Sequence, residues 1–132
     1  MSVVPSTSTI NHAAFDRLVM SELPEVAAEL DTEDRALLHV EMAAVARATS
    51  RAIEAGETPT ITRHFALMEK VLSSAASDVE NAVHVSYLEN IFLGEERAAF
   101  LAARRNLPPL LERGLIELEQ HFENLARHAK DT

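Results

Sequence analysis

Apolar residues recur every three or four positions along most of this chain, the spacing that places side chains on one face of an α-helix. The clearest series lies near the end of the chain at spacings of +4, +3, +4, +3 and +4: Leu111, Leu115, Leu118, Phe122, Leu125 and Ala129. Two earlier series repeat at +4, +3, +4 and +3: Leu38, Met42, Val45, Thr49 and Ala52, and then Ile61, Phe65, Met68, Leu72 and Ala75. No stretch alternates apolar and polar residues for long enough to make a strand. The pattern predicts an all-α fold.

Residue types that start and stop helices divide this pattern into five to six helices. The side chain of Asn11 can cap the N-terminus of a helix, and Asp31 or Thr32 can cap a later one. Gly56 is of the residue type that often ends a helix. We therefore expect a first helix after Asn11, a short helical turn over 24–30 and a helix over about 33–55. Prolines favour the first turn of a helix, so further helices should begin near Thr58 and at Pro108-Pro109.

The central stretch, residues 77–94, carries a signal at each end. Ser77 and Glu80 have the spacing of a capping box, and Gly94 can end the helix. Its apolar residues cover more than one face, which is typical of a helix packed between others. We expect an antiparallel hairpin with the preceding helix. A short helix should follow over 95–105, and Gly114 in the last helix should mark a close crossing.

These elements fit one domain over residues 11–130, arranged as a compact bundle or a short HEAT-like α-solenoid. Residues 1–10 are rich in Ser and Thr and predict a flexible lead-in. Hydrophobic residues make up 47% of the chain and charged residues 25%, a balance typical of globular domains. There is no cysteine, so disulfides and thiol chemistry are excluded. The start resembles no signal peptide and no apolar run could span a bilayer, which favours a cytoplasmic location.

Metal and catalytic motifs are missing from the sequence. None of the six histidines stands three residues after a glutamate, so the Glu-x-x-His pairs of di-metal bundles are absent. The Gly-x-Ser-x-Gly turn and glycine-rich phosphate loops are absent as well, in a chain with three glycines. We therefore expect no metal, no cofactor and no catalytic residues, and we interpret the chain as a protein that is not an enzyme.

The formal net charge of −9 is unevenly distributed. It opposes direct binding to nucleic acid, which requires a cationic surface. No base lies between Arg17 and Arg35, and this interval holds a block of acids: Glu22, Glu25, Glu29, Asp31, Glu33 and Asp34. Such a block has two interpretations, a solvated corner whose acids favour a helix N-terminus or a docking patch for a basic partner.

A second candidate surface combines Tyr87, Glu89 and Asn90 of the central stretch with Glu95 and Glu96 after it. Tyr87 is the only tyrosine in a chain without tryptophan. It can be part of the core, which the apolar character of its helix favours, or it can anchor an interface through an exposed hydroxyl.

Two segments carry a resemblance to known proteins. The stretch His84-Val-Ser-Tyr-Leu-Glu-Asn-Ile-Phe, together with Leu107-Pro-Pro-Leu-Leu-Glu and the later Leu-Glu-Gln-His-Phe, resembles a family of small uncharacterised bacterial helical proteins. The helix pair over 60–93 resembles a HEAT-type repeat. Small proteins of this kind are often immunity proteins that neutralise a toxin. The resemblance implies binding rather than catalysis and assigns no site residues.

The leading hypothesis is therefore a non-catalytic, immunity-type inhibitor that binds a basic toxin or effector through the acidic block. A regulatory or structural module that assembles with itself or within a larger complex is the first alternative. An acidic mimic of nucleic acid, of phage origin, is the second. No membrane partner is expected.

Overall fold

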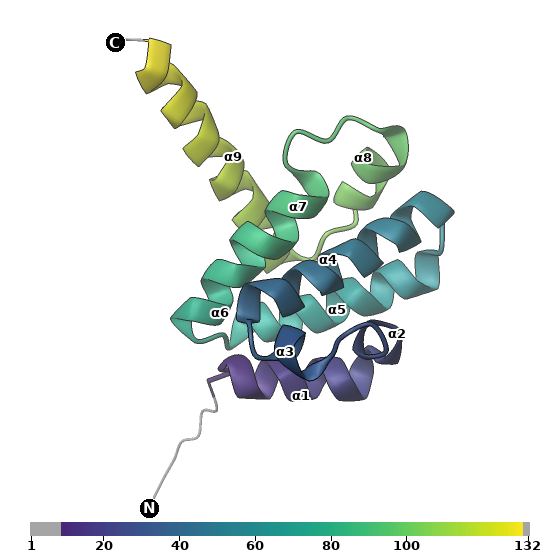
Figure 1. Ribbon diagram of the computed structural model, residues 1–132. Coiled ribbons are helices and arrows are strands. Elements are labelled where there is room, and N and C mark those ends of the chain that lie inside the picture. Colours follow the sequence, from purple (N-terminus) through teal and green to yellow (C-terminus); the bar gives the residue numbers. More distant parts are fainter. Residues whose placement is uncertain (1–8, 131–132) are drawn as a thin grey trace, which may run out of the picture.

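The computed structural model describes residues 9–130, and helices make up most of that range (Figure 1). Because α6, η1 and α7 follow one another without a gap, the named segments form eight helices in the described residues. The bounds are α1 His12–Glu22, α2 Pro24–Ala27, α3 Thr32–Arg35, α4 Leu38–Ala55, α5 Thr58–Ser73, α6 Ser77–Ala82, η1 Val83–Leu88, α7 Glu89–Phe92, α8 Ala98–Arg104 and α9 Pro109–Lys130. The all-α prediction is confirmed, and the predicted count of five to six helices was too low.

One extra helix is α2, which lies within the predicted helical turn over 24–30, and the other arises where a predicted segment is divided. The predicted helix over 33–55 is interrupted around Leu37, whose backbone is extended (φ −112°, ψ 108°). The single turn before the break, α3, is held to α1 by Arg35, which donates two hydrogen bonds to Asp16 at 3.0 and 2.9 Å. No proline or glycine marks this break, so local sequence rules did not reveal it.

Several predicted helix ends are confirmed. The Asn11 side chain accepts a hydrogen bond from the Ala14 amide at 2.9 Å, and Gly56 ends α4 with a positive φ of 69°. Asp31 caps α3 in a reciprocal capping box with Asp34. Pro109 begins α9. Each of these ends is determined by a residue within one turn of it, so the sequence alone could identify them.

Other predicted ends were wrong. Ser77 is the first residue of α6 rather than its cap: Ala76 is the N-cap, it provides no side-chain bond, and its carbonyl accepts from the Glu80 amide. The short helix α8 begins at Ala98, so Glu95 and Glu96 precede it instead of forming its first turn. Residues 1–8 of the predicted lead-in lie outside the described residues. Ile10, within that lead-in, pairs through its backbone with Ser74 and Ala76.

The continuous helix α6–η1–α7 lies at the centre of the molecule, as its wide apolar arc predicted. It packs against α4 and α9, and its buried residues include Val83, Leu88 and Ile91. The preceding helix α5 packs mainly against α4 and α9 rather than forming the expected hairpin with its successor. No helix in the described part of the chain has the length and apolar character needed to cross a bilayer.

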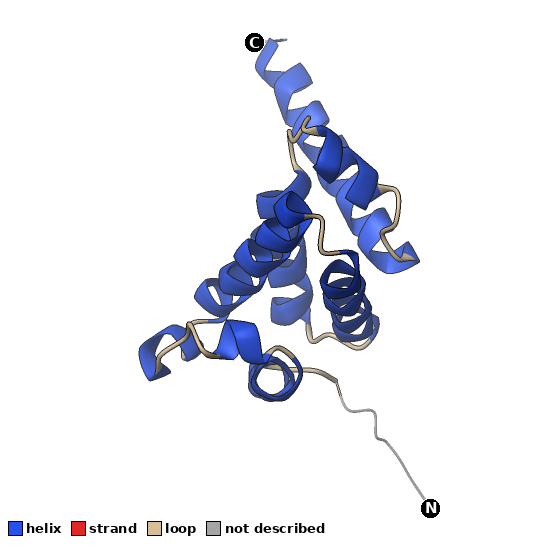
Figure 2. Ribbon diagram, turned by 90° about the vertical axis from the view of Figure 1, so that its right-hand side faces the viewer, coloured by secondary structure: helices blue, strands red, loops and turns tan. Residues whose placement is uncertain are grey.

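Helix α9 is buried near its start and exposed to solvent over its far half. Near its start, Leu111 and Leu115 are fully buried, and the Glu69 side chain accepts from the amides of Leu110 and Leu111. Further along, Phe122 and Leu125 are 41% and 50% exposed. Both views show the far half of α9 extending away from the other helices (Figures 1 and 2). The predicted apolar seam is therefore core in its first half only.

Candidate binding surface

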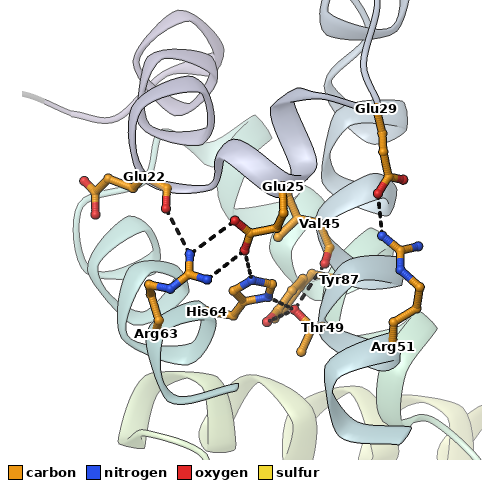
Figure 3. Close-up of polar contacts among 9 residues, drawn as sticks. All are labelled: Glu22, Glu25, Glu29, Val45, Thr49, Arg51, Arg63, His64 and Tyr87. Atoms are coloured by element: carbon orange, nitrogen blue, oxygen red, sulfur yellow. Dashed lines mark hydrogen bonds and ion pairs between the residues drawn. The ribbon is translucent and has the colours of Figure 1, made fainter. Parts of the chain in front are cut away.

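The acidic block forms a corner, residues 22–34, that carries α2 and α3 and turns the chain from α1 towards α4. Three of its acids reach bases on α4 and α5, and Figure 3 shows two of these ion pairs. The pairs are Glu22 with Lys70 at 3.7 Å, Glu25 with Arg63 at 3.0 Å and Glu29 with Arg51 at 2.6 Å. Exposed pairs of this kind contribute little to stability singly. Their arrangement fixes how the corner sits on α4 and α5.

Glu25 makes the innermost of these contacts. Its Oε2 accepts from Nε2 of His64 at 2.8 Å, while Arg63 also donates to it (Figure 3). Partial burial raises the pKa of Glu25, but the hydrogen bonds from His64 and Arg63 outweigh that effect and lower the pKa to about 2. Glu25 is therefore an ionised carboxylate at neutral pH, and it serves the fold.

A chain of polar groups continues from Glu25 into the core. His64 is fully buried, and its Nδ1 lies 2.8 Å from Oγ1 of Thr49, which lies 3.0 Å from the hydroxyl of Tyr87 (Figure 3). Burial lowers the pKa of His64 more than the contact with Glu25 raises it, which favours the neutral ring. With Nε2 donating to Glu25, the Thr49 hydroxyl donates its one proton to Nδ1 rather than to the Val45 carbonyl 3.1 Å away, and the Tyr87 hydroxyl donates to Thr49. Every member of the chain is satisfied, which buried polar groups require.

The remaining acids of the corner have different surroundings. Asp31 and Asp34 are used by the capping box of α3, where the Asp34 amide donates to Asp31 at 2.8 Å. Glu33 is exposed, and no hydrogen bond or ion pair of its side chain occurs within the described residues. Glu22 and Glu29 stay about half exposed beside their bases. The exposed acids of the corner are therefore Glu22, Glu29, Asp31 and Glu33, and Glu25 is half-buried.

The second candidate surface is not brought together as one patch. Tyr87 is fully buried, which places it in the core, the alternative that its apolar helix favoured, and leaves it unable to contact a partner in this structure. Asn90 donates to the Ser86 carbonyl at 2.8 Å. Glu95 pairs with Arg97, whose hydrogen bond lowers the pKa of Glu95 to about 2. Glu89 is half-buried and Glu96 is exposed.

Glu41 is a buried residue that the sequence analysis did not select. Its side chain is fully buried in α4, its Oε1 lies 3.1 Å from Nε2 of His12, and its Oε2 has no hydrogen-bond partner in the described part of the chain. Burial and, after it, the neighbouring Asp16 carboxylate together raise the pKa of Glu41 to about 9. The sequence did indicate that Glu41 is buried. It stands four residues before Val45 and eight before Thr49, on the apolar face of its helix.

The described residues offer little for catalysis or cofactor binding. No group of three or more His, Cys, Asp or Glu side chains among them could hold a metal ion. Ser86 and Nδ1 of His39 lie 2.6 Å apart, the first two members of a hydrolase triad, but no carboxylate within residues 9–130 bonds the other ring nitrogen. An open groove of about 620 Å³ among α4, α5 and α8 has no charged residue in its lining.

Comparison with known proteins places the chain in a family. Residues 17–123 match the model of a family described as a domain of unknown function, DUF7674. The chain belongs to this family. The matched range includes the acidic corner, the polar chain from Glu25 to Tyr87 and the first half of α9. No curated protein and no solved structure matches the chain. Membership of DUF7674 therefore brings no activity with it, and the function has to be argued from the geometry.

Proposed function

We propose that this protein is a non-catalytic binding module, of the immunity type, that docks a basic protein partner on the outer face of the acidic corner. The observation that carries the proposal is the corner itself. Glu22, Glu29, Asp31 and Glu33 are exposed acids on backbone that contacts with α4 and α5 hold in place. A fixed acidic face steers a basic partner towards it and accelerates association.

The ion pairs within the corner indicate which of its acids a partner could contact. Three bases neutralise part of the corner, yet six carboxylates face only Lys70, Arg63 and Arg51, so the corner remains negative. Glu25 is less available to a partner than the other acids, because His64 and Arg63 already donate to its oxygens. Glu29 and Glu33 are the contacts that a partner would reach first. Glu29 would exchange its hydrogen bond from Arg51 for one from a basic side chain of the partner.

Capture from an extract of the source cell tests this assignment. The immobilised chain is compared with the corner variant Glu29→Gln/Glu33→Lys, which spares Glu25 and the α3 cap. The matched control is Glu57→Gln/Glu80→Lys, which changes two exposed acids elsewhere by the same net charge. We expect the corner variant alone to lose the captured protein. Equal capture by both variants would refute the corner as the docking surface.

Self-assembly is a second candidate, favoured by a different observation. The apolar seam of α9 keeps its helical spacing beyond the core, where Phe122 and Leu125 are exposed. Large apolar side chains in a regular series on a projecting helix are typical of a contact with another helix. This candidate does not involve the acidic corner, so both can hold for one protein.

A further inference from the structure

A hollow between α1 and the end of α5 has a basic lining, although the chain as a whole is acidic. Its volume is about 420 Å³, which is within the range of small-molecule binding sites. Arg17 and Lys70 lie in the lining together with the hydroxyl-bearing residues Ser21 and Ser74, and the lining contains no acid. In a chain of formal net charge −9, two bases without an acid beside them in the lining form a local positive site.

The hydrogen-bond donors of this lining are largely unused within residues 9–130. The Arg17 side chain forms no hydrogen bond or ion pair there. Nζ of Lys70 is 3.7 Å from the nearest oxygen of Glu22, which is longer than a hydrogen bond. The Ser74 hydroxyl likewise has no hydrogen bond to any described residue. These donors are therefore available to an anion that enters the hollow.

The local backbone explains why the donors lie together. Arg17 and Ser21 are four residues apart on α1, so they lie on one face of that helix. Lys70 and Ser74 have the same spacing at the end of α5. Ile10 joins the two helices at this point, because its amide donates to the Ser74 carbonyl at 2.7 Å. This bond fixes one side of the hollow and also occupies a carbonyl oxygen that would otherwise repel an anion.

The remainder of the lining is apolar. Ile10, Ala14 and Leu18 contribute to it, and all three are half-buried. Ile10 and Leu18 also pack against the hydrophobic core, so the core fixes the position of this surface. An apolar group placed on it would remove it from water, with a gain in free energy proportional to the area covered. The lining therefore matches a ligand with one anionic end and one apolar end.

We propose that the hollow binds a small amphipathic carboxylate. The anionic group lies between Arg17 and Lys70, and the apolar tail lies on Ile10 and Leu18. Arginine and lysine donate charge-assisted hydrogen bonds to carboxylate oxygens, and such bonds are stronger than those between neutral groups. The site is independent of docking at the acidic corner, because Glu29 and Glu33 do not line the hollow.

Two features favour a monoanion over a phosphate dianion. The hollow lies at the C-terminal end of α5, where the helix dipole places partial negative charge. The chain as a whole is also strongly negative. Both features oppose the second charge of a phosphate group. A carboxylate carries one charge and presents two oxygens, one for each base.

Titration of the isotope-labelled full chain with octanoate, followed by NMR, tests the site. We expect saturable shifts of the Ile10, Ser21 and Ser74 amides with a dissociation constant of about 1 mM, because the open hollow encloses few ligand atoms. Acetate lacks the tail and octan-1-ol lacks the charge, so each should bind at least about tenfold more weakly. Equally tight binding of octan-1-ol would overturn the proposal, as would octanoate shifts confined to another surface.

Substitution of the two bases gives a second readout. Arg17→Gln/Lys70→Gln should raise the dissociation constant of octanoate by about tenfold. This variant should unfold at the wild-type temperature, because both side chains are exposed. Arg105→Gln/Arg113→Gln removes the same charge from exposed positions outside the hollow and should bind octanoate as the wild-type chain does. Equal weakening in both variants would assign the effect to net charge and contradict the site.

Octyl phosphate tests the choice of anion, since it has the same tail and is a dianion at about pH 8. It should bind more weakly than octanoate, and tighter binding would contradict the assignment of a carboxylate. The corner variant Glu29→Gln/Glu33→Lys should bind octanoate with the wild-type constant. Failure of this site is therefore distinguishable from failure of the docking function.

Discussion

Gly114 of α9 lies directly against His84 of η1: a Cβ atom on Gly114 would be 2.9 Å from Nε2 of the imidazole and 3.1 Å from Cδ1 of Leu88. The helix therefore accepts glycine in its interior, at a propensity cost of about 1 kcal/mol relative to alanine, so that it can approach the central helix. The expected close crossing at this position is confirmed.

A double-mutant cycle measures this contact. Gly114→Ala should lower the free energy of unfolding by about 1–2 kcal/mol, because the propensity gain is smaller than the cost of moving the buried neighbours. In a His84→Ala background the same change should cost about 1 kcal/mol less, since the nearest atom is gone. Urea unfolding gives all four values. An identical effect of Gly114→Ala in both backgrounds would show that His84 is not what the methyl group meets.

The polar chain from Glu25 to Tyr87 predicts that two substitutions lower the free energy of unfolding by different amounts. Tyr87→Phe removes one terminal hydroxyl and should destabilise the protein by about 1 kcal/mol. Thr49→Val keeps the volume but leaves both the Tyr87 hydroxyl and Nδ1 of His64 without their partner, so its cost should be about 2–4 kcal/mol. Chemical unfolding compares the two. If Thr49→Val proves the milder change, Thr49 is not the central link of the chain.

Burial of Glu41 predicts an unusual pH dependence. Its pKa is raised from 4.5 to about 9 in the folded state, so the folded chain keeps a proton that the unfolded chain releases. The stability that this proton contributes is fully present below about pH 4.5 and is lost as the pH rises towards 9, by roughly 1.4 kcal/mol per unit at most.

Glu41→Gln tests that dependence, because the amide is neutral at every pH. Its free energy of unfolding should change much less than that of the wild-type chain between about pH 5 and 8, with the variant the more stable of the two at the alkaline end. The exposed Glu33→Gln variant serves as the control and should keep the wild-type slope. A wild-type slope in Glu41→Gln as well would assign the titration to another group.

A capping side chain at the N-terminus of α4 should stabilise the protein. Leu37 is its N-cap, has the extended backbone of a cap and provides no side-chain hydrogen bond, and it is 58% exposed. Leu37→Asp and Leu37→Asn should each raise the melting temperature, through a gain of about 1 kcal/mol, by accepting from an amide of the first turn. Leu37→Ala is the control without a cap. Equal melting temperatures for the three variants would show that the first-turn amides are already satisfied by water.

What the sequence predicted correctly depends on local chemistry. Asn11, Asp31, Gly56 and Pro109 act within one turn of themselves, so their roles as helix ends could be identified without the fold. Ser77 shows the limit of that approach: its spacing to Glu80 fits a capping box, but Ala76, held by Ile10 through the backbone, is the N-cap, so the helix begins at Ser77 itself.

The features missed are those that depend on contacts between distant residues. The break at Leu37 follows from the attachment of Arg35 to Asp16 on α1. Glu25 was selected as one acid among six, whereas its contact with His64, 39 positions away in sequence, makes it a structural residue. The far half of α9 has the same apolar spacing as the buried half, and spacing alone does not show where the neighbouring helices end.

The central claim, that the acidic corner docks a basic partner, is tested most directly by the rate of association with the captured protein. The rate constant is measured by stopped flow at low and high ionic strength, about 0.02 M and 0.5 M. The wild-type chain and Glu57→Gln/Glu80→Lys should associate quickly at low salt and at least tenfold more slowly at high salt. Glu29→Gln/Glu33→Lys should associate slowly under both conditions. If the corner variant keeps the wild-type rate and salt dependence, the partner does not bind at the corner.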